Sequence, residues 1–258
     1  MKRIQDKLKE DKKIISIYFT AGFPELDDTM AILENLEKAG ADMVEIGLPF
    51  SDPLADGPTI QASSAQALQN GMTSELLFGQ LKGCRESIKM PLIIMGYFNP
   101  ILQFGVENFL KKCQETGIDG LIIPDLPLEV YLSEYKALFE RYSLANIFLI
   151  TPQTSEERIR QIDESTDSFI YIVSSSSVTG GTREFDSRQF EYFERISALN
   201  LKNPQIIGFG ISSRASFEQA ARYQKGAIIG SSFVANLKSR GLHSIADFVN
   251  AVLPAESK

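Results

Sequence analysis

Short apolar runs rich in β-branched residues recur eight times along the chain, and segments with helical spacing separate them. A strand followed by a helix and another strand forms a parallel pair with a crossover helix. Eight such units fill the 258 residues, a usual size for a closed (β/α)8 barrel, so the pattern predicts an α/β protein with a TIM-barrel fold. The predicted strands are 14–20, 42–47, 91–97, 120–124, 146–150, 168–174, 205–210 and 227–231.

Helical segments follow most of these strands, and no linker or low-complexity tract divides the chain, so we expect one barrel domain over residues 1–258. The charged first ten residues predict an extra amphipathic helix, and additional short helices are expected after strands 2 and 8. The alternative is an open doubly wound sheet; its dinucleotide-binding form is disfavoured because no Gly-x-Gly-x-x-Gly follows the first strand. The predicted helices are 26–39, 58–68, 74–87, 106–116, 130–142, 155–164, 186–198 and 213–223.

The charge balance and the rare residue types exclude several classes of function. With 26 basic and 33 acidic residues, the net charge of −7 disfavours nucleic acid or an anionic membrane as a partner. No segment approaches the ~20 apolar residues of a membrane span, and the N-terminus has no apolar signal core. Cys84 and Cys113 read as reduced, buried thiols, which fits a cytoplasmic protein. The single histidine, His243, lies past the last strand as a surface residue, which argues against a metal site and a Ser-His-Asp triad.

Glu45 lies near the end of the predicted strand 42–47, and the loop that follows carries two further carboxylates, Asp52 and Asp56. Val44 and Ile46 suit the helix-facing outside of the barrel, so alternation turns Glu45 inward. A desolvated carboxylate has a raised pKa and can transfer protons near neutral pH; the alternative is a structural Glu bonded to the backbone or to a tyrosine. Taken alone, Asp52 and Asp56 are ordinary turn residues, but prolines stiffen their loop directly above Glu45.

Small residues end the late strands, as in a phosphate-binding barrel mouth. Such barrels often bind phosphate after strands seven and eight at the N-terminus of a short helix. Gly210, Gly230 and Ser231 are the centre of this predicted anion site, with Gly180 closing over it. Helix capping by Ser212, Ser213, Ser231 and Ser232 is the alternative, but it does not explain clusters at the same end of the fold.

Several large side chains fall near the ends of strands or in the early loop. Together they could line a flat apolar pocket, although each alone also suits an ordinary barrel core. These residues are Tyr18, Ile60, Tyr97, Ile122, Tyr171 and Phe209.

Residues 45–61 closely resemble the signature of the tryptophan synthase alpha chain family. Shorter motifs that match the family in order extend the resemblance over essentially the whole chain. The resemblance implies a TIM barrel that cleaves indole-3-glycerol phosphate to indole and D-glyceraldehyde 3-phosphate. It also implies an α2β2 partnership with a beta chain that holds pyridoxal phosphate, while the alpha chain uses no cofactor. The shorter motifs are 20–24, 97–100, 124–127, 178–180, 208–212 and 230–231.

The resemblance assigns roles residue by residue. It makes Glu45 the catalytic acid and base, and Asp56 the carboxylate that bonds the indole N–H. It places Gly180, Gly210, Gly230 and Ser231 at the phosphate, and Thr179 in a loop that closes over the site. Thr20 belongs to the family's opening loop and counts among the expected substrate contacts.

Four positions depart from the family's usual residues, and two other functions compete with the lyase. The departures are Tyr18, Ser175, Ser177 and Ile229, none of which touches the two carboxylates. An isomerase of a ribulose-type phosphate would use the same phosphate end but has no need of residues 48–58. A catalytically weak subunit that mainly activates a beta chain would not need Glu45 and Asp56 intact.

Overall fold

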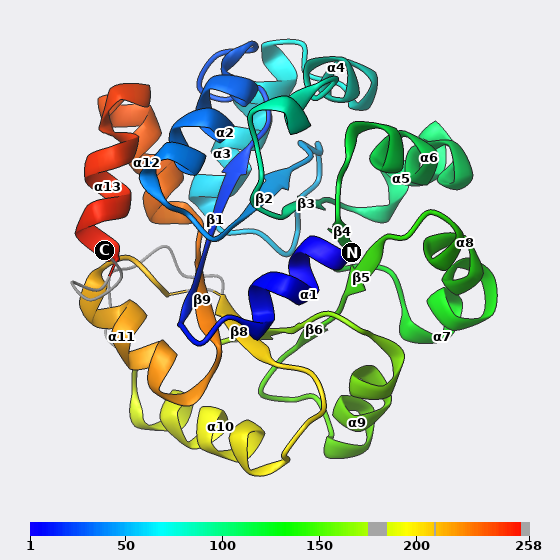
Figure 1. The fold of residues 1–258 in the computed structure, drawn as a ribbon, viewed down its shortest axis with the longest axis vertical. Helices are drawn as coiled ribbons and strands as arrows, with labels where there is room; N and C mark the ends of the chain where they lie inside the picture. The colour runs from blue at the N-terminus through cyan, green and yellow to red at the C-terminus, as the bar shows by residue number, and fades with distance from the viewer. Residues whose placement is uncertain (175–184, 209, 254–258) are drawn as a thin grey trace.

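A computed structural model describes residues 1–174, 185–208 and 210–253, which form a ring of parallel strands surrounded by helices (Figure 1). The strands are β1 Ile14–Thr20, β2 Met43–Gly47, β3 Leu92–Met95, β4 Gly120–Ile122, β5 Ala145–Ile147, β6 Leu149–Ile150, β7 Ile170–Val173, β8 Gln205–Gly208 and β9 Gly226–Ile229. The predicted barrel is therefore confirmed, with each predicted strand found at its expected place.

The ring closes through the fifth predicted strand, which is divided into β5 and β6 by Phe148. The strand order runs from β5 through β4, β3, β2, β1, β9, β8 and β7 to β6, and the paired strands of the described residues all run parallel. At the division, the Phe148 carbonyl accepts a hydrogen bond from the Tyr171 N–H at 2.9 Å. Because β5 pairs with β4 and β6 pairs with β7, this divided strand connects the two ends of the sheet and closes the barrel. The alternative of an open doubly wound sheet is therefore wrong.

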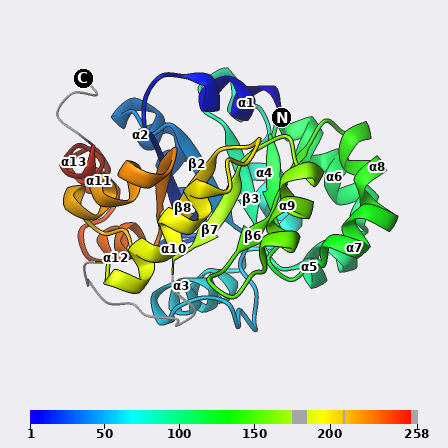
Figure 2. The ribbon, with the colours of Figure 1, turned by 90° about the horizontal axis from the view of Figure 1, so that it is seen from below.

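The helices cover the outside of the barrel, as Figures 1 and 2 show. They are α1 Lys2–Lys9, α2 Asp28–Ala39, α3 Pro58–Gln69, α4 Ser74–Gln80, α5 Phe98–Phe104, α6 Val106–Thr116, α7 Leu128–Val130, α8 Lys136–Arg141, α9 Glu156–Ser165, α10 Ser187–Ala198, α11 Arg214–Tyr223, α12 Ser231–Arg240 and α13 Ile245–Val252. Short helical turns also occur at Cys84–Glu86, Tyr131–Tyr135 and Leu242–Ser244. The extra helix at the N-terminus and the short helices after strands 2 and 8 are all present.

Two predicted helices are shorter or less regular than expected, and one helix was missed. The helix predicted over 74–87 ends at Gln80, and a left-handed Gly83 (φ 78°) precedes the turn Cys84–Glu86. The helix predicted over 130–142 contains a π-helical turn between α7 and α8. The unpredicted α5 has Pro100 in its first turn, where a missing N–H breaks no intrahelical bond.

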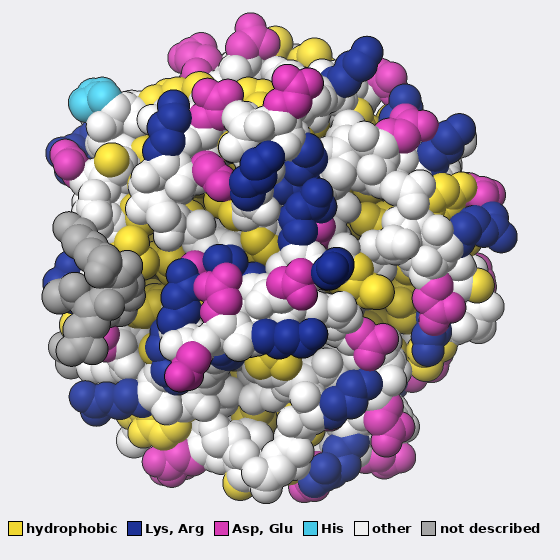
Figure 3. Space-filling view, viewed as in Figure 1, with side chains coloured by type: hydrophobic (Ala, Val, Ile, Leu, Met, Phe, Trp, Pro, Cys, Tyr) yellow, Lys and Arg dark blue, Asp and Glu magenta, His cyan; other side chains and the backbone are white. Residues whose placement is uncertain are grey.

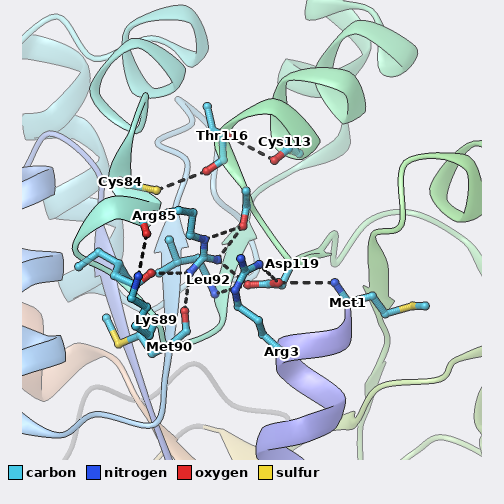
Figure 4. Close-up of polar contacts among 12 residues, drawn as sticks. Met1, Arg3, Cys84, Arg85, Lys89, Met90, Leu92, Cys113, Thr116 and Asp119 are labelled. Atoms are coloured by element: carbon cyan, nitrogen blue, oxygen red, sulfur yellow. Dashed lines mark hydrogen bonds and ion pairs between the residues drawn. The ribbon is translucent and has the colours of Figure 1, made fainter.

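Helix α1 covers the amino-terminal end of the barrel, opposite α3 (Figure 2). Ile4 of this helix is fully buried in the hydrophobic core. Arg3 and Arg85 pair with Asp119 at 3.0 and 2.5 Å, and the same carboxylate accepts the Leu92 N–H at 3.0 Å (Figure 4). A buried carboxylate is tolerated when it is paired and hydrogen-bonded in this way. The ion pairs therefore fasten α1 to the start of β4.

The surface around α1 carries many charged side chains, with Lys and Arg gathered near its centre and Asp and Glu among them (Figure 3). Lys12 pairs with Asp42 at 2.5 Å, and Lys7 pairs with Glu10 at 2.8 Å. Lys7 and Lys12 are thus paired with acidic side chains of the same chain.

The expectations for the two cysteines and the single histidine agree with the structure. Cys84 and Cys113 are both buried and free, and His243 is exposed in the turn before α13. No described helix combines the length and the apolar character that a membrane crossing needs.

Gly226 packs so closely against β1 that a side chain is not tolerated there. A Cβ added at Gly226 would lie 2.0 Å from the Ile14 carbonyl oxygen, which is backbone and cannot rotate away. We expect Gly226→Ala to destabilise the fold by about 2–4 kcal/mol, measured by urea unfolding.

Gly79 in α4 is the matched control for this substitution, because a Cβ there meets nothing within 4 Å. Gly79→Ala should be neutral or stabilising by up to about 1 kcal/mol, since alanine favours the helix. Equal stability of the two variants would contradict the packing argument.

Candidate active site

A cavity of about 340 Å³ opens at the carboxyl ends of the strands. Glu45 and Asp56 lie on its wall together with Gly210, Gly230 and Ser231. The structure thus brings both predicted carboxylates and the described part of the predicted anion site to one cavity. This is the end of a (β/α)8 barrel where ligands bind.

Glu45 points into the barrel, as the strand alternation predicts, and is fully buried. It is in register with Tyr18 on β1 and with Ile93 on β3. Its Oε1 accepts a hydrogen bond from the Ser16 hydroxyl at 3.0 Å, whereas Oε2 has no hydrogen-bond partner among the described residues. Burial raises the pKa of Glu45 to about 8, and the Ser16 hydrogen bond opposes that rise. Near neutral pH, Glu45 is therefore mostly protonated.

Asp56 lies just before α3, where Gly57 is the N-cap and Pro58 is the first helical residue. The Tyr97 hydroxyl donates a hydrogen bond to Asp56 Oδ2 at 3.1 Å and accepts one from the Ala55 N–H at 2.9 Å. Burial raises the pKa of Asp56 to about 6, and the Tyr97 hydrogen bond opposes that rise. Asp56 is therefore mostly ionised at neutral pH, so the cavity holds one acid and one base.

The N-terminus of α12 also lies on the wall of this cavity. Gly230 is its N-cap and Ser231 its first residue, and both line the cavity with the left-handed Gly210 (φ 78°). No side chain among the described residues caps α12, whereas the Ser213 side chain caps α11. Unpaired N–H groups at a helix N-terminus attract anions. The capping alternative therefore holds for Ser213 but not for Ser231.

Large side chains complete the wall near the carboxylates. Tyr18, Ile60 and Tyr171 line the cavity, as predicted. Tyr97 lies beside Asp56 on a narrow adjoining pocket, and its ring stacks on Phe50 with centroids 5.1 Å apart.

Two further predicted contacts line neither the cavity nor the adjoining pocket, and three cannot be placed. The Thr20 hydroxyl lies 2.7 Å from the Ser63 hydroxyl and is buried between β1 and α3. Ile122 is fully buried within β4. Thr179, Gly180 and Phe209 lie outside the described residues, as do Ser175 and Ser177.

Sequence reasoning missed several wall residues that the structure reveals. Thr59, Met95, Ile211 and Ala235 all line the cavity. Ala235 lies one helical turn beyond Ser231, so helical spacing could have identified it. Met95 ends β3 beside Gly47 and could have been found from its strand-end position. Nothing in the sequence pattern singles out Ser16.

Comparisons with known proteins agree on one family. The family model for the tryptophan synthase alpha chain matches residues 4–252. The tryptophan synthase alpha chain of Flavobacterium psychrophilum is 66% identical over 252 residues, covering 98% of this chain and 100% of that protein. That of Christiangramia forsetii is 62% identical, with 98% of each chain covered.

Solved structures agree with the sequence relatives. The tryptophan synthase subunit alpha of Legionella pneumophila superposes with a TM-score of 0.87 at 30% identity, covering 97% of this chain and 96% of that one. An aminoacrylate-bound tryptophan synthase from M. tuberculosis gives a TM-score of 0.85 at 27% identity, with 97% of each chain covered.

Proposed function

The chain belongs to the tryptophan synthase alpha chain family, and from this premise we propose how its cavity cleaves indole-3-glycerol phosphate to indole and D-glyceraldehyde 3-phosphate. This lyase reaction is a retro-aldol step in tryptophan biosynthesis. The residue assignment is carried by two buried carboxylates, Glu45 and Asp56, that line one cavity together with the N-terminus of α12. Burial raises the pKa of Glu45 to about 8 and that of Asp56 to about 6, so the two groups suit different tasks near neutral pH.

We propose that the substrate spans the cavity from α12 to the loop before α3. Its phosphate would accept hydrogen bonds from backbone N–H groups at Gly230 and Ser231, with Gly210 allowing close approach. Its indole ring would lie against Tyr18, Ile60 and Tyr171.

Cleavage first requires protonation of the indole ring at C3. Glu45 donates that proton, and Asp56 accepts the indole N–H hydrogen bond and stabilises the positive charge that develops on nitrogen. Glu45, now a carboxylate, removes the proton from the glycerol hydroxyl as the carbon–carbon bond breaks. The bonding pair returns to the ring, so indole and the aldehyde form and Glu45 is again protonated.

The partner of this subunit is a tryptophan synthase beta chain, which consumes the indole. We propose an α2β2 heterotetramer in the cytoplasm, with pyridoxal phosphate held by the beta chain and no cofactor in this one. We propose that the loop between β2 and α3, in which Leu54 is 87% exposed, contacts the beta chain.

One assay separates this function from the two competing ones. Indole should form from indole-3-glycerol phosphate with the chain alone and faster with the beta chain present. A ribulose-phosphate isomerase would form no indole. With a purely activating subunit, the rate of indole formation would not change when Glu45 is replaced.

The anion site is tested by placing a charge at the N-terminus of α12. Gly230→Asp should raise KM for indole-3-glycerol phosphate at least about tenfold and abolish competitive inhibition by inorganic phosphate, because like charges repel at close range. Gly230→Ala is the control, since its Cβ would make an ordinary 3.5 Å contact with Tyr18. Phosphate inhibition that survives in the Asp variant would remove the proposed anion site.

A further inference from the structure

Ser16 lies in the middle of β1, fully buried inside the barrel. Its registered neighbours are Met43 on β2 and Ile228 on β9, both apolar and buried. Among the described residues, the Ser16 hydroxyl donates a hydrogen bond to Glu45 Oε1 at 3.0 Å. A hydroxyl in an apolar interior is costly unless it is hydrogen-bonded, so this contact accounts for a serine here.

The two oxygens of Glu45 are made unlike by this contact. Oε1 is engaged by Ser16, and Oε2 is buried with no hydrogen-bond partner among the described residues. While Ser16 donates its single hydroxyl proton to Oε1, a proton on Glu45 is directed to Oε2. Because a hydroxyl can also accept, Ser16 can remain paired if the carboxyl proton moves to Oε1.

We propose that Ser16 is a positioning residue that keeps the transferable proton of Glu45 on Oε2, the oxygen left for the substrate. This inference rests on the proposed function, because it requires Glu45 to give and regain a proton during cleavage. Its partner must then suit both the acid and the carboxylate. A hydroxyl does so, whereas an aliphatic side chain would leave both oxygens without a fixed orientation.

Other titratable groups also lie near Glu45, and an effect of Ser16 must be separated from theirs. Tyr18 on β1 and Tyr171 on β7 interact electrostatically with Glu45, and Asp56 lines the same cavity. The neighbour of Glu45 on β3, Ile93, is apolar. Burial raises the pKa of Glu45, and the Ser16 hydrogen bond lowers it. Loss of the hydroxyl therefore raises the pKa of Glu45 further.

Threonine and valine have the same shape and differ in the hydroxyl, so Ser16→Thr and Ser16→Val form a matched pair. Each variant is assembled with the beta chain, and kcat and KM for indole-3-glycerol phosphate are measured from pH 6 to pH 10. Compared with Ser16→Thr, Ser16→Val should lower kcat roughly tenfold, leave KM within about twofold, and move the alkaline inflection upward by roughly one unit. Coincident pH profiles and rates for the pair would overturn the proposal. If Ser16→Val does not fold, Ser16→Ala against Ser16→Thr decides by the same criterion.

The Glu45→Gln background separates this inference from the proposed function. In that background, Ser16→Val and Ser16→Thr should have equal rates, because no transferable carboxyl proton remains; a persisting difference would show that Ser16 acts elsewhere and overturn the inference. If Glu45→Gln alone keeps most of the rate, the catalytic assignment fails and the role of Ser16 fails with it. If Glu45→Gln loses the rate but the Ser16 pair is indistinguishable with Glu45 present, the Ser16 inference alone fails.

Discussion

Replacing Glu45 by glutamine is expected to lower kcat for indole-3-glycerol phosphate cleavage by about 10³, with KM changed little, because general acid–base catalysis contributes roughly 10²–10⁴. The amide keeps the size of the side chain and can accept from Ser16, but it cannot deliver a proton to the indole ring. The measurement is indole formation with the beta chain present. A variant that retained most of the rate would show that another group transfers the proton.

The same substitution should change the pH profile. In the parent chain, activity should rise with pH through about 6, as Asp56 ionises, and fall through about 8, as Glu45 loses its proton. In Glu45→Gln, the residual activity should no longer fall as pH rises through about 8, because the amide does not ionise. The rise in activity with the ionisation of Asp56 should remain.

Stability provides the control for Glu45→Gln. The pKa of Glu45 rises from its ordinary 4.5 to about 8 in the folded chain. The folded state therefore holds the proton more tightly, and this contribution to stability is fully present below pH 4.5 and is lost as pH rises through about 8. A neutral glutamine avoids that loss, so the variant should be more stable than the parent at pH 9 by a few kcal/mol, and close to it at pH 4. Slow catalysis by a chain at least as stable would exclude misfolding as the cause.

Replacing Asp56 by asparagine is expected to lower kcat by about 10²–10³, with KM within a fewfold of the parent. The amide keeps the position of the side chain beside Tyr97, but it carries no negative charge to balance the positive charge on the indole nitrogen. Steady-state kinetics of indole formation across a range of substrate concentrations would measure both constants. Loss of binding with kcat unchanged would instead indicate a structural role for Asp56.

Asp52 offers a matched control in the same loop. Its side chain is exposed and accepts a hydrogen bond from the Ser51 hydroxyl at 2.5 Å, outside the lining of the cavity. Asp52→Asn should leave cleavage by the isolated chain within about twofold of the parent, as most exposed substitutions are mild. A loss equal to that of Asp56→Asn would mean that loop charge in general, rather than one carboxylate, supports the reaction.

The sequence predicted the barrel and the inward direction of Glu45 because both follow from periodicity. Eight strand–helix units leave few ways in which the parallel strands can pair with one another. The alternation of side chains along 42–47 determines which of them face the inside of the barrel. The division at Phe148 and the π turn at Tyr131–Tyr135 could not be predicted, since both depend on how neighbouring elements close the ring and pack.

Contacts within the site were harder to predict than the direction of each side chain. Thr20 lies at the end of β1, yet its hydroxyl is bonded to Ser63 of α3 rather than turned to the cavity. The Ser16–Glu45 hydrogen bond joins residues of the paired strands β1 and β2 that are not register partners, so it depends on the side-chain rotamer. Tyr97 reaches Asp56 from 41 residues away in sequence, and no local spacing encodes that approach.

Helix α1 limits the routes by which substrate enters the barrel and products leave it. Because Ile4 and the Asp119 ion pairs hold α1 over the amino-terminal end, the reaction chamber is closed on that side. Substrate entry and the departure of two products must then share the carboxyl end. The aldehyde's phosphate would lie against α12 and the indole against the loop before α3, so each product would leave along a different wall of the same opening. A beta chain that covers the loop side would give indole a separate exit while the phosphorylated product returns to solvent.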